Sequence, residues 1–334
     1  AAREQFLLPS TIAAQPISSN GKVTISKSKE HITLTGKEFA VTFSAKTGTI
    51  ASYQHKSETL ITSGAVPNFW RAPVDNDLGN GINLRTALWQ EAGRRTSVTQ
   101  VSIDSTQSDR AMLQFTSKVD TLAATVTQRY TVFGNGAIYV DFEFEPHKEG
   151  LPEMLRVGNE YSINGELSNM EWYGRGPHES YWDRQTSAFV GLYSGKVWEQ
   201  YHPYVRAQET GNKTDVRWLT LTNSQGNGLM VVGAPLIFAN AQQFDTDLLN
   251  HTGSMVKHNH GGSITPSTTI SLHIDYKQIG VGGDNSWGAK THSRYSLPCK
   301  KYNYSYLLKP FQKGADNPFY WQGVSKWLNQ NNVN

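Results

Sequence analysis

The stretch 124-ATVTQRYTVFGNGAIYVDFEFEP-146 contains two alternating segments joined by a glycine-rich connection. In its second half, apolar residues occupy every other position, namely Ile138, Val140, Phe142 and Phe144. Successive side chains of a strand point to opposite faces, so this pattern predicts a strand with one buried face. The first half alternates as well, and Gly-Asn-Gly suits a tight reversal of the chain. The stretch therefore predicts an antiparallel β-hairpin.

Similar alternating segments recur along the chain, with turn signals such as 46-KTGT-49 and 224-SQGNG-228 between them. Many antiparallel strands with few short helices predict an all-β fold, a large antiparallel β-sandwich. The additional strands are expected at 31–36, 38–45, 215–222, 229–233, 270–278 and 303–310.

Two segments have helical rather than alternating spacing. In 84-LRTALWQEAGRR-95, the positions Leu84, Ala87, Leu88 and Glu91 share one helical face. The other segment, 317–330, begins with an asparagine that can cap a helix and a proline suited to its first turn. We expect a short helix at each place.

Composition argues against several classes of function. The 334 residues include 31 basic and 28 acidic side chains, a net charge of +3, which gives no reason to expect nucleic-acid or membrane binding. The longest apolar run, 228–241, is too short to cross a bilayer. Cys299 is the single cysteine, so an internal disulfide is impossible.

The chain's opening suggests a domain organisation with a linker from a missing upstream domain at 1–18, a sandwich domain at 19–311 and a C-terminal extension at 312–334.

Two patterns suggest catalysis or metal binding only weakly. Glu160 follows an asparagine, as the acid/base of many retaining glycosidases does, but it lies in an alternating strand and no partner carboxyl is evident nearby. His258 and His260 would share a face if their segment is extended, although two histidines without a third ligand make a poor metal site. We expect no metal and no cofactor in this chain.

Two other stretches combine aromatic, acidic and amide side chains. In 69-FWRAPVDNDLGNG-81, three acceptor residues follow a proline and precede glycines, which predicts a tight loop. In 171-EWYGRGPHESYWDR-184, four aromatic rings flank a Gly-Arg-Gly-Pro turn. Aromatic rings cover the C–H face of a pyranose while polar groups bind its hydroxyls. Both stretches therefore fit either a carbohydrate site or turns stabilised by Arg–carboxylate pairs.

Four motifs in this order resemble the C-terminal domain of large bacterial β-galactosidases of glycoside hydrolase family 2: 68-NFWRAPVDNDLGNG-81, 171-EWYGRGPHESYWDR-184, 202-HPYVRAQETGNKTDVRW-218 and 280-GVGGDNSWG-288. The resemblance covers roughly residues 20–311. It implies a supersandwich of the galactose-mutarotase-like kind, preceded in the parent chain by a jelly-roll domain, two immunoglobulin-like domains and a TIM barrel. These upstream domains and a β-galactoside or galactose are the partners it implies.

The resemblance also implies roles for particular residues. The family's catalytic glutamates lie in the barrel, and no position here matches them. Its pocket tryptophan corresponds to Trp287, and its DNDxG loop bordering the galactose pocket corresponds to Asp75, Asn76, Asp77 and Gly79. We expect Trp287 to be exposed and to lie on the same side of the sandwich as that loop. The sequence after Gly79 departs from the family pattern.

Two alternatives remain at this stage. The chain could be a stand-alone carbohydrate-binding module, or a free aldose 1-epimerase with an acid/base pair such as His202 and Glu209. Neither the exact substrate nor the cellular compartment follows from the sequence; the Asn-, Thr- and Ser-rich composition favours a periplasmic or secreted parent only slightly.

Overall fold

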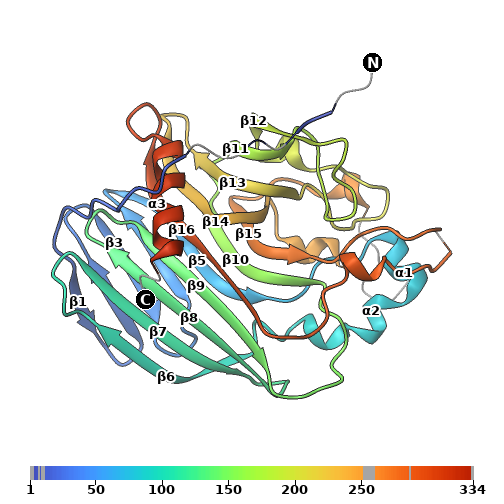
Figure 1. Ribbon diagram of the computed structural model, residues 1–334, viewed down its shortest axis with the longest axis horizontal. Helices are drawn as coiled ribbons and strands as arrows, with labels where there is room; N and C mark the ends of the chain where they lie inside the picture. Colours follow the sequence, from blue (N-terminus) through green and yellow to red (C-terminus); the bar gives the residue numbers. More distant parts are fainter. Residues whose placement is uncertain (1–3, 7, 9–11, 251–259, 286, 332–334) are drawn as a thin grey trace.

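The computed structural model describes residues 4–6, 8, 12–250, 260–285 and 287–331. Within these residues the strands form one continuous antiparallel sheet that curls over a common core (Figure 1). The expected all-β fold with few short helices is confirmed. Its strands are β1 (Thr24–Lys27), β2 (His31–Thr35), β3 (Phe39–Ser44), β4 (Ile50–His55), β5 (Glu58–Asn68), β6 (Thr96–Asp104), β7 (Arg110–Val119), β8 (Ala124–Phe133), β9 (Ile138–Pro146), β10 (Arg156–Asn164), β11 (Asn169–Gly176), β12 (Phe189–Lys196), β13 (Lys213–Thr222), β14 (Asn227–Gln242), β15 (Thr269–Gln278) and β16 (Tyr302–Gln312).

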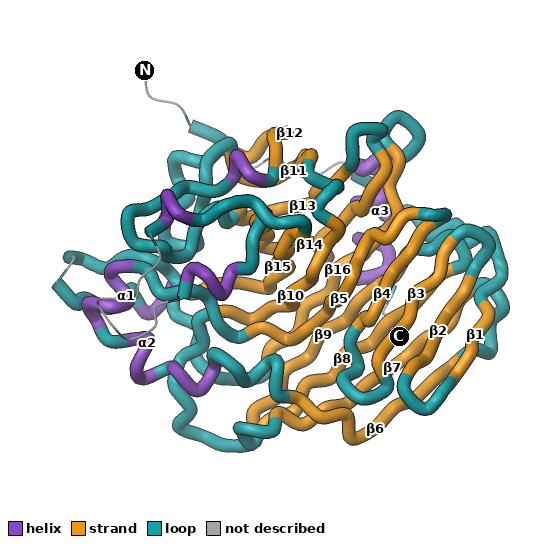
Figure 2. The backbone as a smooth tube through the Cα atoms, turned by 180° about the vertical axis from the view of Figure 1, so that it is seen from behind, coloured by secondary structure: helices purple, strands orange, loops and turns teal. Residues whose placement is uncertain are grey.

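The order of the strands differs from their order in the chain. Along the sheet it runs β1-β2-β3-β4-β5-β10-β15-β14-β16-β9-β8-β7-β6, and β13, β11 and β12 extend from β14. Two meanders, β1–β5 and β6–β9, thus lie on either side of four central strands that come later in the chain. Loops and short helices gather at one end of the sheet, which Figure 2 shows at its left.

The predicted hairpin at 124–146 is present as β8 and β9, paired from Ala124 opposite Pro146 to Val132 opposite Ile138. The apolar face of β9 enters the main core as its alternation predicts. Tyr139 on the opposite face is buried as well, because the C-terminal helix α3 (Pro318–Gln330) covers that face. A second apolar cluster around Trp321, Val324 and Leu328 of α3 fills the space between helix and sheet.

Helix α3 begins as the sequence predicts. The Asn317 side chain accepts a hydrogen bond from the Phe319 amide at 3.0 Å, and Pro318 occupies the first turn. The Gln15 amide donates to the carbonyl oxygen of Gly323, so part of the N-terminal segment packs along the helix. Among the described helices, none is long and apolar enough to cross a membrane.

The other helical expectations need correction. The segment 84–95 is not one helix: α2 (Ile82–Arg85) is followed by the 3-10 turn η1 (Ala87–Trp89). Leu84 is 78% exposed whereas Trp89 is fully buried, so the predicted apolar face is not the buried one. The expected loop in 69–81 contains a short helix instead, α1 (Asp75–Asn80). Both α1 and α2 lie at the loop-rich end of the sheet (Figure 1).

Candidate functional site

Helix α1 is held in place from inside the protein by Arg71. The Arg71 side chain is fully buried and forms an ion pair with Asp77, with 2.6 Å between Nη1 and Oδ2. The same carboxylate oxygen of Asp77 accepts from the Val74 amide at 2.8 Å, which closes the first turn of the helix. The Asp77 carboxylate therefore faces inward and closes the helix start. That Asp77 borders a ligand pocket stays a prediction.

Asp75 and Asn76, the two preceding residues of α1, have more open surroundings. The Asp75 carboxylate forms an ion pair with Arg206 at 3.1 Å and accepts from the Gln208 side chain at 3.0 Å, and it is 63% exposed. The Asn76 side-chain amide donates to the carbonyl oxygen of Val281 at 3.3 Å. Helix α1 thus links the motif at 202–218 to the glycine-rich motif at 280–288.

The glycine-rich motif packs closely against its surroundings. A Cβ on Gly280 would lie 2.5 Å from the Thr291 hydroxyl and 2.8 Å from the Asp183 carboxylate, so only glycine fits there. Gly288 has a φ of +109° and would place a Cβ 2.9 Å from the Gly79 carbonyl oxygen. The glycines therefore let the loop approach both α1 and the turn that bears Asp183.

Trp287 stands between these fixed points with its side chain in solvent. Its residue is 91% exposed, and its amide donates to the Asn285 side chain at 2.9 Å. The contact of Gly288 with Gly79 and that of Asn76 with Val281 place this loop against α1. The exposure and the common side expected for Trp287 and the DNDxG segment are both observed; a contact with a ligand stays a prediction.

The motifs at 171–184 and 202–218 join through Glu179. Its carboxylate accepts from the Gly211 amide at 2.8 Å and from the Tyr204 hydroxyl, and it forms an ion pair with Arg184. Burial alone would raise the pKa of Glu179, but these hydrogen bonds and the charge of Arg184 lower it below its ordinary value. Glu179 is therefore an ionised anchor.

All four motifs meet around a shallow cleft with a volume of about 170 Å³. Its wall combines carboxylate, amide, guanidinium and phenol groups, which suit a polar uncharged ligand. Sequence reasoning did not single out Arg206 or Gln208, because nothing in the pattern distinguishes them from other polar loop residues. The cleft is lined by Val74, Asp75, Asn76, Tyr181, Arg184, Tyr204, Gln208, Glu209 and Val281.

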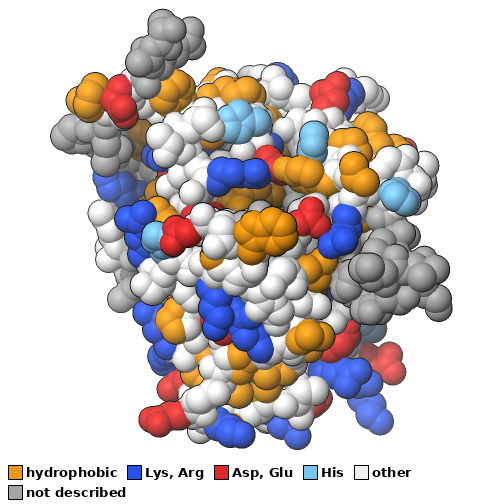
Figure 3. Space-filling model, turned by 90° about the vertical axis from the view of Figure 1, so that its right-hand side faces the viewer, with side chains coloured by type: hydrophobic (Ala, Val, Ile, Leu, Met, Phe, Trp, Pro, Cys, Tyr) orange, Lys and Arg blue, Asp and Glu red, His pale blue; other side chains and the backbone are white. Residues whose placement is uncertain are grey.

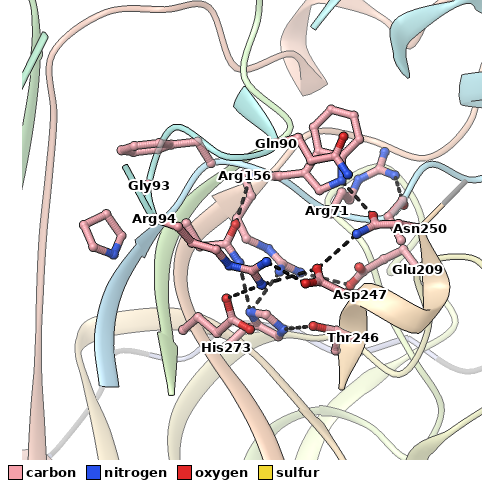
Figure 4. A pocket seen from close by; sticks show the side chains of 16 residues that line it. Arg71, Gln90, Gly93, Arg94, Arg156, Glu209, Thr246, Asp247, Asn250 and His273 are labelled. Carbon is pink, nitrogen blue, oxygen red and sulfur yellow. Dashed lines mark hydrogen bonds and ion pairs between the residues drawn. The ribbon is translucent and has the colours of Figure 1, made fainter. Parts of the chain in front are cut away.

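A second polar cleft lies between the sheet and the segments near residues 94 and 247 (Figure 4). Arg94 forms ion pairs with both Glu160 and Asp247, and burial raises the pKa of Glu160. His273 accepts from Arg156 at its Nδ1, and burial, reinforced by nearby cations, lowers its pKa well below the ordinary value. Glu160 is therefore a strand residue of β10 engaged in an ion pair, as the strand interpretation predicts.

The His–Glu pair of the epimerase alternative has separate surroundings. Glu209 is buried and bonds to Arg156 at 3.1 Å and to the Asn240 side chain at 2.9 Å. His202 is exposed and packs its ring against Tyr204, with 4.3 Å between centroids. This arrangement does not assign acid and base roles to the two residues.

The suggested histidine metal site is only partly visible. His258 lies outside the described residues, and His260 is exposed, with Nδ1 3.2 Å from the Val205 carbonyl oxygen. Within the described part of the chain, no group of three or more histidine, cysteine, aspartate and glutamate side chains could hold a metal ion.

Comparison with known proteins agrees with the motifs. A β-galactosidase of Priestia megaterium is 37% identical over 311 residues, which are 92% of this chain and 29% of that protein. A β-galactosidase of Pseudoalteromonas haloplanktis is 30% identical over 298 residues, 86% of this chain and 27% of that protein. The chain thus spans less than a third of the length of these relatives.

A solved aldose epimerase homologue from C. elegans aligns over 87% of this chain and 99% of its own, at 9% identity and a TM-score of 0.44, a similarity too low to support an argument about function. The model of the β-galactosidase small chain matches residues 35–308. Since this match covers most of the sequence, the chain belongs to the β-galactosidase small-chain family.

Proposed function

We propose that this chain is the C-terminal domain of a retaining β-galactosidase and forms one wall of its galactose pocket. The parent enzyme would hydrolyse terminal β-D-galactosyl bonds through a galactosyl-enzyme intermediate. Its two catalytic carboxylates would come from an upstream TIM barrel, and this domain would contribute binding surface and assembly rather than chemistry. The family membership and the short coverage of the longer relatives support this assignment.

The observation that carries the proposal is the exposed Trp287 on an anchored loop. A tryptophan that is 91% exposed forfeits most of the burial energy that the ring could supply within its own domain. The loop that presents it is nevertheless fixed by Arg71 and Asn76, which bind its backbone. A fixed loop with a free ring is suited to stacking on the C–H face of a sugar.

The same end of the molecule exposes other apolar side chains. Leu84 on α2 is 78% exposed, and Val205, next to the Arg206 that binds Asp75, is 81% exposed. Figure 3 views this end, where apolar side chains lie among charged ones. Such a mixed surface resembles those between domains of one chain. We assign it to contact with the barrel of the parent enzyme.

The test replaces Trp287 by alanine in the longer β-galactosidase chain that contains this region. Loss of stacking is expected to weaken galactoside binding by about 1–3 kcal/mol, about fivefold to 150-fold in KM. The control is Tyr320→Ala, which removes a partly exposed ring of α3 remote from the loop. An unchanged KM in Trp287→Ala, with the fold intact, would refute the proposed role.

A further inference from the structure

Asp183 lies at the tip of a tight turn between β11 and β12. The turn is closed by two backbone hydrogen bonds between Tyr181 and Arg184, each 2.9 Å long, so its tip is well fixed. Trp182 at the same tip packs against Tyr295. The hydrogen-bonded turn therefore fixes the backbone at Asp183 and, with it, the position of the carboxylate.

Both carboxylate oxygens of Asp183 bind the glycine-rich loop. Oδ1 accepts from the Val281 amide at 3.0 Å, and Oδ2 accepts from the Gly282 amide at 2.8 Å. Hydrogen bonds to an ionised acceptor are roughly twice as strong as neutral ones. Gly280 permits this approach, because a Cβ there would collide with the same carboxylate.

Trp287 depends on this anchor more than a buried residue would. Its ring is almost fully exposed, so packing within the domain contributes little to its position. The position of the ring therefore depends on the backbone of its loop, which Asp183 binds at Val281 and Gly282. We propose that Asp183 is a positioning residue for galactoside binding, which acts by fixing the stem of the loop that carries Trp287. This inference rests on the proposed function above.

A purely structural role for Asp183 predicts a different outcome. In that case, changing Asp183 would lower stability and reduce activity equally whether or not Trp287 is present. If Asp183 acts through Trp287, the effect on KM should disappear once the indole is gone. A double-mutant cycle separates the two roles.

The experiment measures KM and kcat of the longer β-galactosidase chain in four forms: wild type, Asp183→Asn, Trp287→Ala and the double variant. Asparagine keeps the shape but loses the charge and one acceptor. We expect KM to rise about three- to tenfold in Asp183→Asn and less than about twofold when it is added to Trp287→Ala. Asp215→Asn is the matched control, because Asp215 binds Arg175 rather than the loop.

A second readout is independent of turnover. For each form, the emission of Trp287 is isolated by subtracting the emission of the same form carrying Trp287→Ala. The fluorescence anisotropy of this difference is then measured. Release of the loop in Asp183→Asn should lower that anisotropy, while Asp215→Asn should not. The positioning role would be overturned if Asp183→Asn raised KM equally in the presence and in the absence of Trp287, or if it left the anisotropy of Trp287 unchanged. If Trp287→Ala alone leaves KM unchanged, the proposed function fails and the anisotropy alone decides the role of Asp183.

Discussion

Asp75 and Asp77 lie two positions apart in α1 and have opposite surroundings. Asp75 lies at the surface between Arg206 and Gln208, whereas Asp77 is buried against Arg71. A buried arginine that loses its ion-pair partner keeps its desolvation penalty without that compensation. An exposed pair contributes little because water screens it.

We therefore predict that Asp77→Ala lowers the free energy of unfolding by about 3–5 kcal/mol. The matched change Asp75→Ala should lower it by about 1 kcal/mol or less. Urea unfolding of both variants beside the wild type measures the difference. If the two variants lowered the free energy of unfolding equally, burial of the Arg71–Asp77 pair would not determine how much that pair contributes to stability.

Lys213 on β13 gives a prediction about pH. Burial lowers its pKa to about 8, against a smaller opposing effect of Glu179, and its ammonium lies 5.1 Å from the Trp172 ring centroid. Between about pH 8 and the ordinary lysine value of about 10.4, the unfolded chain holds this proton and the folded chain does not. Stability contributed by this group must therefore rise with pH across that window.

The measurement compares the wild type with Lys213→Met by urea unfolding at pH 7.5, 8.5 and 9.5. The advantage of the methionine variant should shrink as the pH rises. The buried tyrosines also titrate at high pH, but they are common to both proteins and cancel in the comparison. A difference that does not change with pH would contradict the lowered pKa.

The residues of the site were only partly predictable. The motif identified Trp287. Its exposure agrees with the glycines around it, because glycines offer no side chains against which the ring could pack. The letters Asp-Asn-Asp do not reveal which carboxylate turns inward. That choice depends on Arg71, whose guanidinium lies beneath the first turn of α1 and forms an ion pair with Asp77.

At the level of elements, α3 shows what helix signals can and cannot provide. Asn317 and Pro318 predict where the helix begins, and they do so correctly. They do not reveal that it lies on β14 and buries Tyr139 on the otherwise polar face of β9. That outcome depends on where a strand distant in sequence is placed in the sheet.

Trp321 on the covered face of α3 should therefore be important for stability. We expect Trp321→Ala to lower the free energy of unfolding by about 3–5 kcal/mol, as for other buried aromatic side chains. Tyr320→Ala, at the next position but partly exposed, is the control and should have a clearly smaller effect. If both variants lowered the free energy of unfolding by similar amounts, α3 would not be held on the sheet through the face that bears Trp321.

The segment 84–95 shows why periodicity alone failed. Its spacing fits a helix, yet the chain must approach β5 so closely that a Cβ on Gly93 would lie 1.8 Å from the Pro67 carbonyl oxygen. Trp89 also turns into the core against Phe69 and Phe144. These tertiary contacts replace a continuous helix with α2 and a 3-10 turn.

For the molecule as a whole, the proposal predicts a domain that folds but does not catalyse. The 334-residue chain should give no turnover of a chromogenic β-galactoside above a heat-inactivated sample. Galactose should bind more weakly than about 1 mM, because one wall leaves most of the sugar in water.

Calorimetry and the chromogenic assay check these expectations on the same preparation. Turnover would show that the chain carries catalytic groups of its own. Micromolar binding without turnover would favour the stand-alone carbohydrate-binding module. Urea unfolding with a single cooperative transition is the control that the chain is folded.

The overall topology was less accessible from sequence than the strands. Alternation in β8 and β9 identifies a local hairpin, since its two partners adjoin in the chain. Nothing in the alternation of β5 shows that it pairs with β10, or that β9 pairs with β16. These pairings depend on the packing of the whole sheet.

The place of the late strands in the sheet has a consequence for synthesis on the ribosome. Strand β9 ends at Pro146, and its partner β16 begins at Tyr302. Translation of the roughly 150 intervening residues takes about 10–30 s at ordinary elongation rates. During that interval β9 presents an unpaired sheet edge, which readily associates with edges of other chains. The nascent chain is therefore most vulnerable to aggregation before β16 emerges, and a holdase chaperone would be most useful in that interval.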